Sequence, residues 1–221
     1  MKGMKMKKSF IGAIALTTIA TPALAHHPLA GAPMETFAQG MLSGIGHPLL
    51  GFDHLFFVLA VGLAALFTGN ARFATGSYIV AMLAGCLMMS FGIGLPVKEI
   101  VIGASLLVVG GILVSGRGLT LPVAAALFAA FGLFHGSAFG DSIAGQEAAI
   151  GGSVLIGYLI GLGVLQYVMA MAAGWAAKTI FGATEAGAMN ARLAGAVVAG
   201  MGLFLSLENA EGIAFAALGL A

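Results

Sequence analysis

Two histidines and an aspartate stand close together in the segment His47-Pro-Leu-Leu-Gly-Phe-Asp53-His54. Two imidazoles and a carboxylate suit a borderline divalent cation such as nickel, cobalt, copper or zinc. Pro48 is typical of the first turn of a helix, where its missing N–H costs nothing. A helix that starts there carries His47 at its mouth, with Asp53 and His54 about 9–10 Å further along and His54 on nearly the same face as His47. The segment predicts a metal site, and a His–Asp pair that satisfies only itself is the alternative.

A third histidine lies in the segment Phe134-His135-Gly136-Ser137-Ala138-Phe139-Gly140-Asp141. Its surroundings are apolar, and an ionisable side chain in such a setting is costly and usually functional. Gly136 and Gly140 are four residues apart, which lets another helix pack directly against this segment. His135 is therefore a further candidate ligand.

The composition defines the elements that must position these side chains. Apolar residues make up 60% of the 221 residues, charged residues only 8%, and the mean hydropathy is +1.08. An average soluble domain has about 25% charged residues, so a water-soluble protein is excluded. The apolar runs are continuous over about 16–25 residues, as in membrane-spanning helices, and do not alternate as in outer-membrane barrels. The sequence predicts an all-α membrane protein.

The first 25 residues have the pattern of a secretory signal. Four lysines precede the apolar run from Phe10 to Ala20, and Ala23-Leu24-Ala25 ends the segment with the small residues that a signal peptidase recognises. We expect cleavage after Ala25, with residues 26–221 forming a single domain; an uncleaved first helix is the alternative. Without those lysines the acidic residues outnumber the basic ones, which argues against a nucleic-acid partner.

Six apolar stretches follow, and they predict a bundle of six membrane-spanning helices. They lie near residues 48–68, 73–95, 99–115, 120–140, 150–176 and 191–207. Residues 29–46 are expected to form a short helix along the outer surface. Residues 210–221 are apolar but too short to span, so we expect them at the interface or against the bundle.

The charges between the spans predict the orientation. Alternate loops carry four basic residues against one acid, Glu185: Arg72, Arg117, Lys178 and Arg192. By the positive-inside rule these loops are cytoplasmic, which gives a multi-pass protein of the bacterial inner membrane with a periplasmic mature N-terminus. In this topology His135 lies roughly 9 Å below the outer surface, the same depth as Asp53 and His54. The equal depth predicts one shared site, with independently packed histidines as the alternative.

These two histidine segments resemble the signature motifs of the HupE/UreJ family. Its members are bacterial inner-membrane proteins linked to nickel or cobalt uptake for hydrogenase and urease. The resemblance covers essentially the whole chain, including the signal and the six spans. It implies that the metal ligands are His47, Asp53, His54 and His135.

The chain departs from the family pattern at several positions. Many relatives carry a histidine where this chain has Phe139 and an acid where it has Ser142. Asp141, one position earlier, supplies the carboxylate in this interpretation. Relatives often have a histidine late in the fifth span, where this chain has Gln166 and Tyr167.

Other residues are weaker candidates. His26 and His27, at the mature N-terminus, offer an amine and imidazoles to a metal, or are an incidental end. Ser137 and Gln166 are candidates to line a path, although Gln166 equally suits a bond to a neighbouring helix. Three sulfur-bearing residues are potential ligands for Cu(I), with core packing as the alternative: Cys86, Met88 and Met89.

The sequence favours a secondary permease that imports nickel or cobalt for metalloenzyme maturation, with no permanently bound cofactor. Its partners are then the metal ion, the lipid bilayer and a periplasmic metal donor, and the oligomeric state is left open. No Walker motif is found, so the chain does not use ATP itself. The main alternative is a non-transporting metal sensor or a hydrogenase or urease assembly factor.

Two further classes are weaker. Ser137 is two residues from His135, and neighbours at that spacing point apart on a helix, which disfavours an enzyme. A haem carrier with His54 and His135 as axial ligands is a further alternative.

Overall fold

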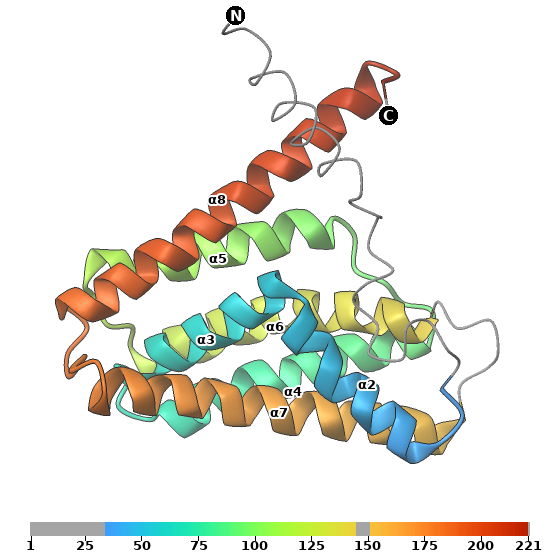
Figure 1. Ribbon diagram of the computed structural model, residues 1–221, viewed down its shortest axis with the longest axis horizontal. Helices are drawn as coiled ribbons and strands as arrows, with labels where there is room; N and C mark the ends of the chain where they lie inside the picture. The colour runs from blue at the N-terminus through green and yellow to red at the C-terminus, as the bar shows by residue number, and fades with distance from the viewer. Residues whose placement is uncertain (1–33, 145–150, 221) are drawn as a thin grey trace, which may run out of the picture.

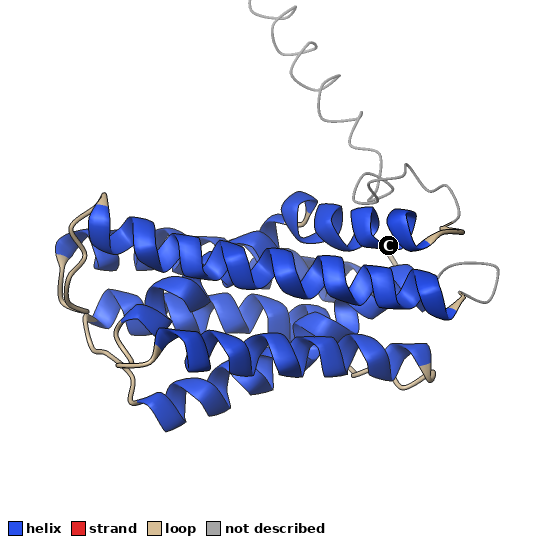
Figure 2. Ribbon diagram, turned by 90° about the horizontal axis from the view of Figure 1, so that it is seen from below, coloured by secondary structure: helices blue, strands red, loops and turns tan. Residues whose placement is uncertain are grey.

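The structure is a computed structural model that describes residues 34–144 and 151–220. The expected signal peptide and its cleavage site, together with His26 and His27, lie outside the described residues. In the described part all regular structure is helical (Figure 2), as predicted. The helices are α2 (Phe37–Leu50), α3 (Phe52–Leu66), α4 (Ala71–Ser90), α5 (Lys98–Ser115), α6 (Leu121–Ala144), α7 (Gly152–Thr179) and α8 (Met189–Ala217).

The helices α4 to α8 are each long and apolar enough to cross a membrane. Helices α2 and α3 pass the same test only together, as one span bent by 83°. The count of candidate spans is five, or six with the bent pair, and the chain is a multi-pass membrane protein. We call the end of the bundle that carries Lys98 the outer end and the end that carries Arg117 the inner end.

The expectation of one straight helix over residues 48–68 is wrong. Pro48 lies inside the last turn of α2 and does not begin a span. Gly51 separates the two helices in an extended conformation, and its N–H is bonded to the carbonyl of His47. A Cβ at Gly51 would lie only 3.0 Å from the ring of His54, so a residue without a side chain suits this break. His47 and His54 therefore belong to different helices, and the argument that they share one helix face is also wrong.

The helix expected over residues 29–46 is present as α2, but it is packed into the bundle. It begins at a capping box in which Thr36 and Gln39 bond each other's backbone N–H groups. Gly44 lies directly on α7, where a Cβ would approach the carbonyl oxygen of Tyr158 to 2.2 Å. Figure 1 shows α2 and α7 crossing on the same side of the bundle.

The expected end of the last span near residue 207 is also wrong, whereas the expected place of residues 210–221 at the interface or against the bundle stays a prediction. Helix α8 continues without interruption to Ala217, and its last turns extend beyond the other helices (Figure 1). It packs mainly on α5, and the side chain of Asn209 donates to the carbonyl of Glu99 at 3.3 Å. Neither proline nor a left-handed glycine interrupts this helix, so nothing in its backbone ends it at the predicted boundary.

Glycines let the helices approach closely, as their spacing predicted. A Cβ at Gly136 of α6 would lie 1.9 Å from the carbonyl oxygen of Met82 in α4. A Cβ at Gly62 of α3 would lie equally close, at 1.9 Å, to the carbonyl oxygen of Ala170 in α7. These contacts fix α3 and α6 within the bundle, and those two helices carry the central histidines.

Candidate metal site

The two histidine segments meet inside the bundle. The Nδ1 atoms of His54 on α3 and His135 on α6 are 2.8 Å apart, which is a hydrogen bond. His54 is 6% exposed and His135 is fully buried. The structure thus brings together residues that are 81 positions apart in the chain. Their role as metal ligands stays a prediction.

Asp53 lies beside this pair, in the first turn of α3. Its Oδ2 atom is 3.7 Å from Nε2 of His54, and its side chain is partly exposed. A carboxylate is stabilised at a helix N-terminus, where the backbone N–H groups point outward. The break at Gly51 creates that N-terminus, and so the bent backbone positions the acid next to the imidazole.

His135 has a second polar partner that the sequence analysis missed. Its Nε2 atom is 3.0 Å from Oγ of Ser105 on α5, and Ser105 is also fully buried. The Ser105 hydroxyl lies 2.7 Å from the carbonyl oxygen of Ile102 one turn earlier. The ring of Phe57 stacks on His135 with a centroid distance of 4.1 Å. A single serine in an apolar span gave no sequence signal of this contact, because its partner is 30 residues away.

His47 reaches the same region from α2. Its Nδ1 atom is 3.1 Å from the hydroxyl of Tyr158 on α7, which donates to the carbonyl of Phe139 at 3.0 Å. The rings of His47 and His54 have centroids 6.1 Å apart. We call His47, His54 and His135 together the histidine layer.

Phe139 occupies the space between two of these rings. Its buried side chain lies 4.1 Å from the ring of His54 and 5.1 Å from that of His47, between centroids. This is a position where the family resemblance leads one to expect a histidine. The chain therefore presents an apolar ring to the histidine layer in place of another imidazole.

Asp141 is engaged elsewhere. It forms an ion pair with Lys98 of α5 at 2.5 Å, and its side chain is 47% exposed. Lys98 and its neighbour Glu99 lie in the first turn of α5, so charged residues gather at this end of the bundle. Asp141 thus belongs to a charged rim in this structure, and its role as a ligand stays a prediction. The side chain of Ser142 lies outside the described part.

The two candidate path residues are both buried and hydrogen-bonded. Ser137 Oγ accepts the backbone N–H of Leu95 at 3.0 Å, which ties the α4–α5 connection to α6. Gln166 Oε1 accepts the hydroxyl of Tyr78 at 2.5 Å, a bond between α7 and α4. The ring of Tyr78 is 6.4 Å from that of His135, so the Tyr78–Gln166 pair is the next polar contact toward the inner end. Gln166 makes the interhelical bond that was its alternative, and path lining stays a prediction for both.

The described residues do not form a ready coordination sphere. In residues 34–144 and 151–220, no group of three or more His, Cys, Asp or Glu side chains is placed to hold one metal ion. The imidazoles instead bond each other and nearby hydroxyls. An ion that binds between His54 and His135 must first open the hydrogen bond between them.

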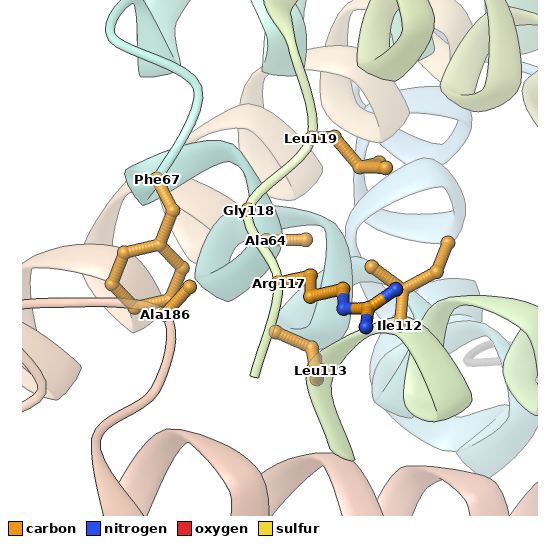
Figure 3. Close-up of a pocket in the computed structure, with 8 residues that line it drawn as sticks. All are labelled: Ala64, Phe67, Ile112, Leu113, Arg117, Gly118, Leu119 and Ala186. Carbon is orange, nitrogen blue, oxygen red and sulfur yellow. The ribbon is translucent and has the colours of Figure 1, made fainter. Parts of the chain in front are cut away.

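The pockets at the inner end of the bundle are lined by other residues than those of the histidine layer. One pocket there is bordered by α3, α5 and two loops (Figure 3), and Arg117 is its charged residue. It is lined by Ala64, Phe67, Ile112, Leu113, Arg117, Gly118, Leu119 and Ala186. A second pocket is mostly apolar, with Asn190 among its lining residues. Neither pocket includes a residue of the histidine layer.

Comparison with known proteins agrees with the motifs. The family model described as HupE / UreJ protein matches residues 14–205, a range that includes both histidine segments. The chain is 30% identical over 186 residues to Protein HupE of Rhizobium leguminosarum bv. viciae, which covers 83% of this chain and 91% of that protein. No solved structure matches the chain.

Proposed function

Because this chain belongs to the HupE/UreJ family, we propose that it is a secondary permease for a divalent transition metal. The ion is nickel or cobalt, and it moves across the inner membrane to supply metalloenzymes such as hydrogenase or urease. The mature N-terminus is periplasmic and receives the ion from a periplasmic donor. The metal is cargo in this proposal, and no cofactor is permanently bound.

The buried pair of His54 and His135, with Asp53 beside it, is the observation that carries the proposal. A divalent cation without compensation is prohibitively costly in a low-dielectric interior. Asp53 supplies a negative charge to offset part of that cost, and imidazole nitrogens are suitable donors for nickel and cobalt. His54 contacts both Asp53 and His135, whereas most of the bundle around these side chains is apolar.

The order of the contacts suggests a route. The ion loses water near His47 and Asp53, which are the more exposed groups, and binds to Asp53 and His54. Separation of the two imidazoles then lets His135 take part, and the Tyr78–Gln166 pair follows. Because that pair is uncharged, it holds a cation less strongly than the carboxylate does, which favours release toward the inner end.

Catalysis is the function that the contacts support least, and we propose that the chain is not an enzyme. In the described part, Ser137 accepts the backbone N–H of Leu95, and its hydrogen-bond partner there is not an imidazole. Ser105 does bond His135, but it is fully buried and lies within hydrogen-bond distance of a backbone carbonyl. An activated nucleophile needs a free hydroxyl proton for its base and access to a substrate.

A non-transporting sensor or assembly factor is the second candidate. The observation in its favour is the closed histidine layer, in which the described side chains bond one another. A sensor would bind the metal without moving it inward, so accumulation of metal in cells separates the two functions.

The test is uptake of radioactive nickel, cobalt and zinc by cells with and without this protein. We expect faster accumulation of nickel or cobalt when the protein is present, with zinc as the comparison ion. Equal accumulation in the two cell lines, with the protein found in the membrane fraction, would favour the sensor or assembly factor over the permease.

A further inference from the structure

Ser105 forms a contact that constrains where the protons of the histidine layer sit. Its hydroxyl has one hydrogen, yet its oxygen lies 2.7 Å from the Ile102 carbonyl oxygen and 3.0 Å from Nε2 of His135. Two oxygens at that separation repel each other unless a hydrogen lies between them. Both contacts are favourable only if the hydroxyl donates to Ile102 and Nε2–H of His135 donates to Ser105.

This arrangement decides the state of the other nitrogen of His135. An uncompensated charge is costly in an apolar interior, so the fully buried ring of His135 is neutral and carries one N–H. With that hydrogen on Nε2, the Nδ1 atom of His135 is a bare acceptor. It lies 2.8 Å from Nδ1 of His54, so His54 must be the donor in this bond.

His54 is then fixed in the opposite tautomer. Its Nδ1 carries the hydrogen of that bond, and Nε2 is the nitrogen that faces Asp53, 3.7 Å from Oδ2. That separation is longer than a hydrogen bond. Divalent zinc bonds histidine nitrogen and carboxylate oxygen at about 2.0–2.2 Å, so one ion of this size can span the gap.

We propose that Ser105 is a positioning residue, which acts through His135 to hold the hydrogen of His54 on Nδ1 and so to keep Nε2 as the nitrogen that meets an ion beside Asp53. Metal-ligating histidines commonly donate their second N–H to an acceptor that fixes the ring and its tautomer. Here the acceptor is another imidazole, and Ser105 fixes that imidazole in turn. His135 thus supports the first ion contact and becomes available as a ligand only when the two rings separate. The consequence for uptake rests on the proposed function, whereas the tautomers do not.

The direct test is nitrogen-15 NMR of the full-length, metal-free protein with labelled histidines. Signals are assigned from their loss in single histidine variants. We expect the hydrogen on Nε2 in His135 and on Nδ1 in His54. In Ser105→Ala the signals of His135 should shift toward the Nδ1–H form, and Ser105→Thr, which keeps a hydroxyl, should restore them. Unchanged tautomers in Ser105→Ala, or the hydrogen on Nδ1 of His135 in the unaltered protein, would overturn the proposal.

A matched control is available in α4. Ser77 makes an equivalent hydrogen bond, to the Ala74 carbonyl at 2.7 Å, so Ser77→Ala removes the same kind of bond from another helix. It should leave the histidine signals unchanged, and a shift as large as that in Ser105→Ala would count against the proposal. If Ser105→Ala does not accumulate in the membrane, Ser105→Cys, which has a weakly accepting sulfur, provides the same comparison.

Nickel uptake provides the second readout. Loss of an outer partner typically costs about 10–100-fold in metal affinity. Ser105→Ala should therefore raise the half-saturating nickel concentration by about that factor, with little change in the maximal rate, and Ser105→Thr should reverse the increase. An unchanged half-saturating concentration would overturn the link to ion binding. If NMR finds the predicted tautomers but the unaltered protein takes up no nickel, the proposed function is refuted and the positioning role of Ser105 is supported.

Discussion

At the outer end of the bundle a helix is broken and three imidazoles lie close together, whereas at the inner end the pockets are lined mainly by apolar side chains. The break at Gly51 gives α3 a new N-terminus there, beside Asp53. Arg117 is the charged residue among those that line the two inner pockets. Polar side chains in the described part are thus concentrated where the backbone is interrupted, and under the proposed function a cation meets these groups first.

Polar groups do continue inward from the histidine layer, but sparsely. The Tyr78–Gln166 bond lies beside His135, and Thr75 is one turn from Tyr78 on the same helix. In the described part, the hydroxyl of Thr75 is the buried side-chain polar atom that lacks a hydrogen-bond partner. Polar contacts are thus dense at the outer end and sparse beyond it, which is the distribution that the proposed permease requires.

The largest expected effect follows removal of the first ion contact. Asp53→Ala and His54→Ala should each reduce nickel uptake to the background of cells without the protein, because a dehydrated cation then lacks a charge or a ligand. Both variants should still insert, since removing an ionisable group relieves a cost when no metal is bound. Membrane protein levels and uptake are measured together. Glu208→Ala, at an exposed site on α8, is the acidic control and should transport normally.

His135→Ala should reduce uptake nearly as much. It removes the partner of the His54 hydrogen bond and the imidazole that follows along the proposed route. The effect should exceed that of Ser105→Ala, which leaves the ring in place. Uptake at a range of nickel concentrations separates the two variants. Normal transport by His135→Ala would show that Asp53 and His54 are sufficient for ion binding. The proposed route from the outer end past His135 would then be contradicted.

Phe139→His should strengthen nickel binding at the outer end of the bundle. The ring at this position lies against both His47 and His54, so a second nitrogen donor becomes available there. We expect a several-fold lower half-saturating nickel concentration together with a slower maximal rate, because tighter binding slows release. Phe131→His, on the same helix and against Phe57 instead, is the matched control. Identical kinetics for both variants and the unaltered protein would place the ion outside the histidine layer.

The smallest functional effect is expected from glycines that serve only packing. Gly62→Ala introduces a Cβ 1.9 Å from the carbonyl oxygen of Ala170, and overpacking of this kind typically costs about 1–3 kcal/mol. Gly76→Ala, where a Cβ meets nothing within 4 Å, should instead be stabilising by up to about 1 kcal/mol. Thermal unfolding in detergent measures both. A loss of stability in Gly76→Ala equal to that in Gly62→Ala would contradict the close packing of α3 on α7.

The sequence predicted the long spans well, because uninterrupted apolar runs leave few alternatives to a helix. It failed at Pro48, which is typical of a helix start but here lies in the last turn of α2. The residues around Pro48 fit a helix that begins there and a helix that ends there equally well. Only the packing of α2 on α7 distinguishes the two structures. The sequence did not identify Ser105 as a partner of His135, because that contact joins two helices and no residue spacing within one helix indicates it. Phe139 was singled out only through the family resemblance, and its position against the imidazoles gives that difference a physical meaning.

Nickel flux into liposomes that contain the purified protein tests the central claim most directly, because no other transporter or donor is present. The unaltered protein and Glu208→Ala should both admit radioactive nickel down its concentration gradient without ATP, and Asp53→Ala and His54→Ala should match empty liposomes. Equal flux in all four preparations, or none in the unaltered protein after correct insertion, would contradict transport through the histidine layer.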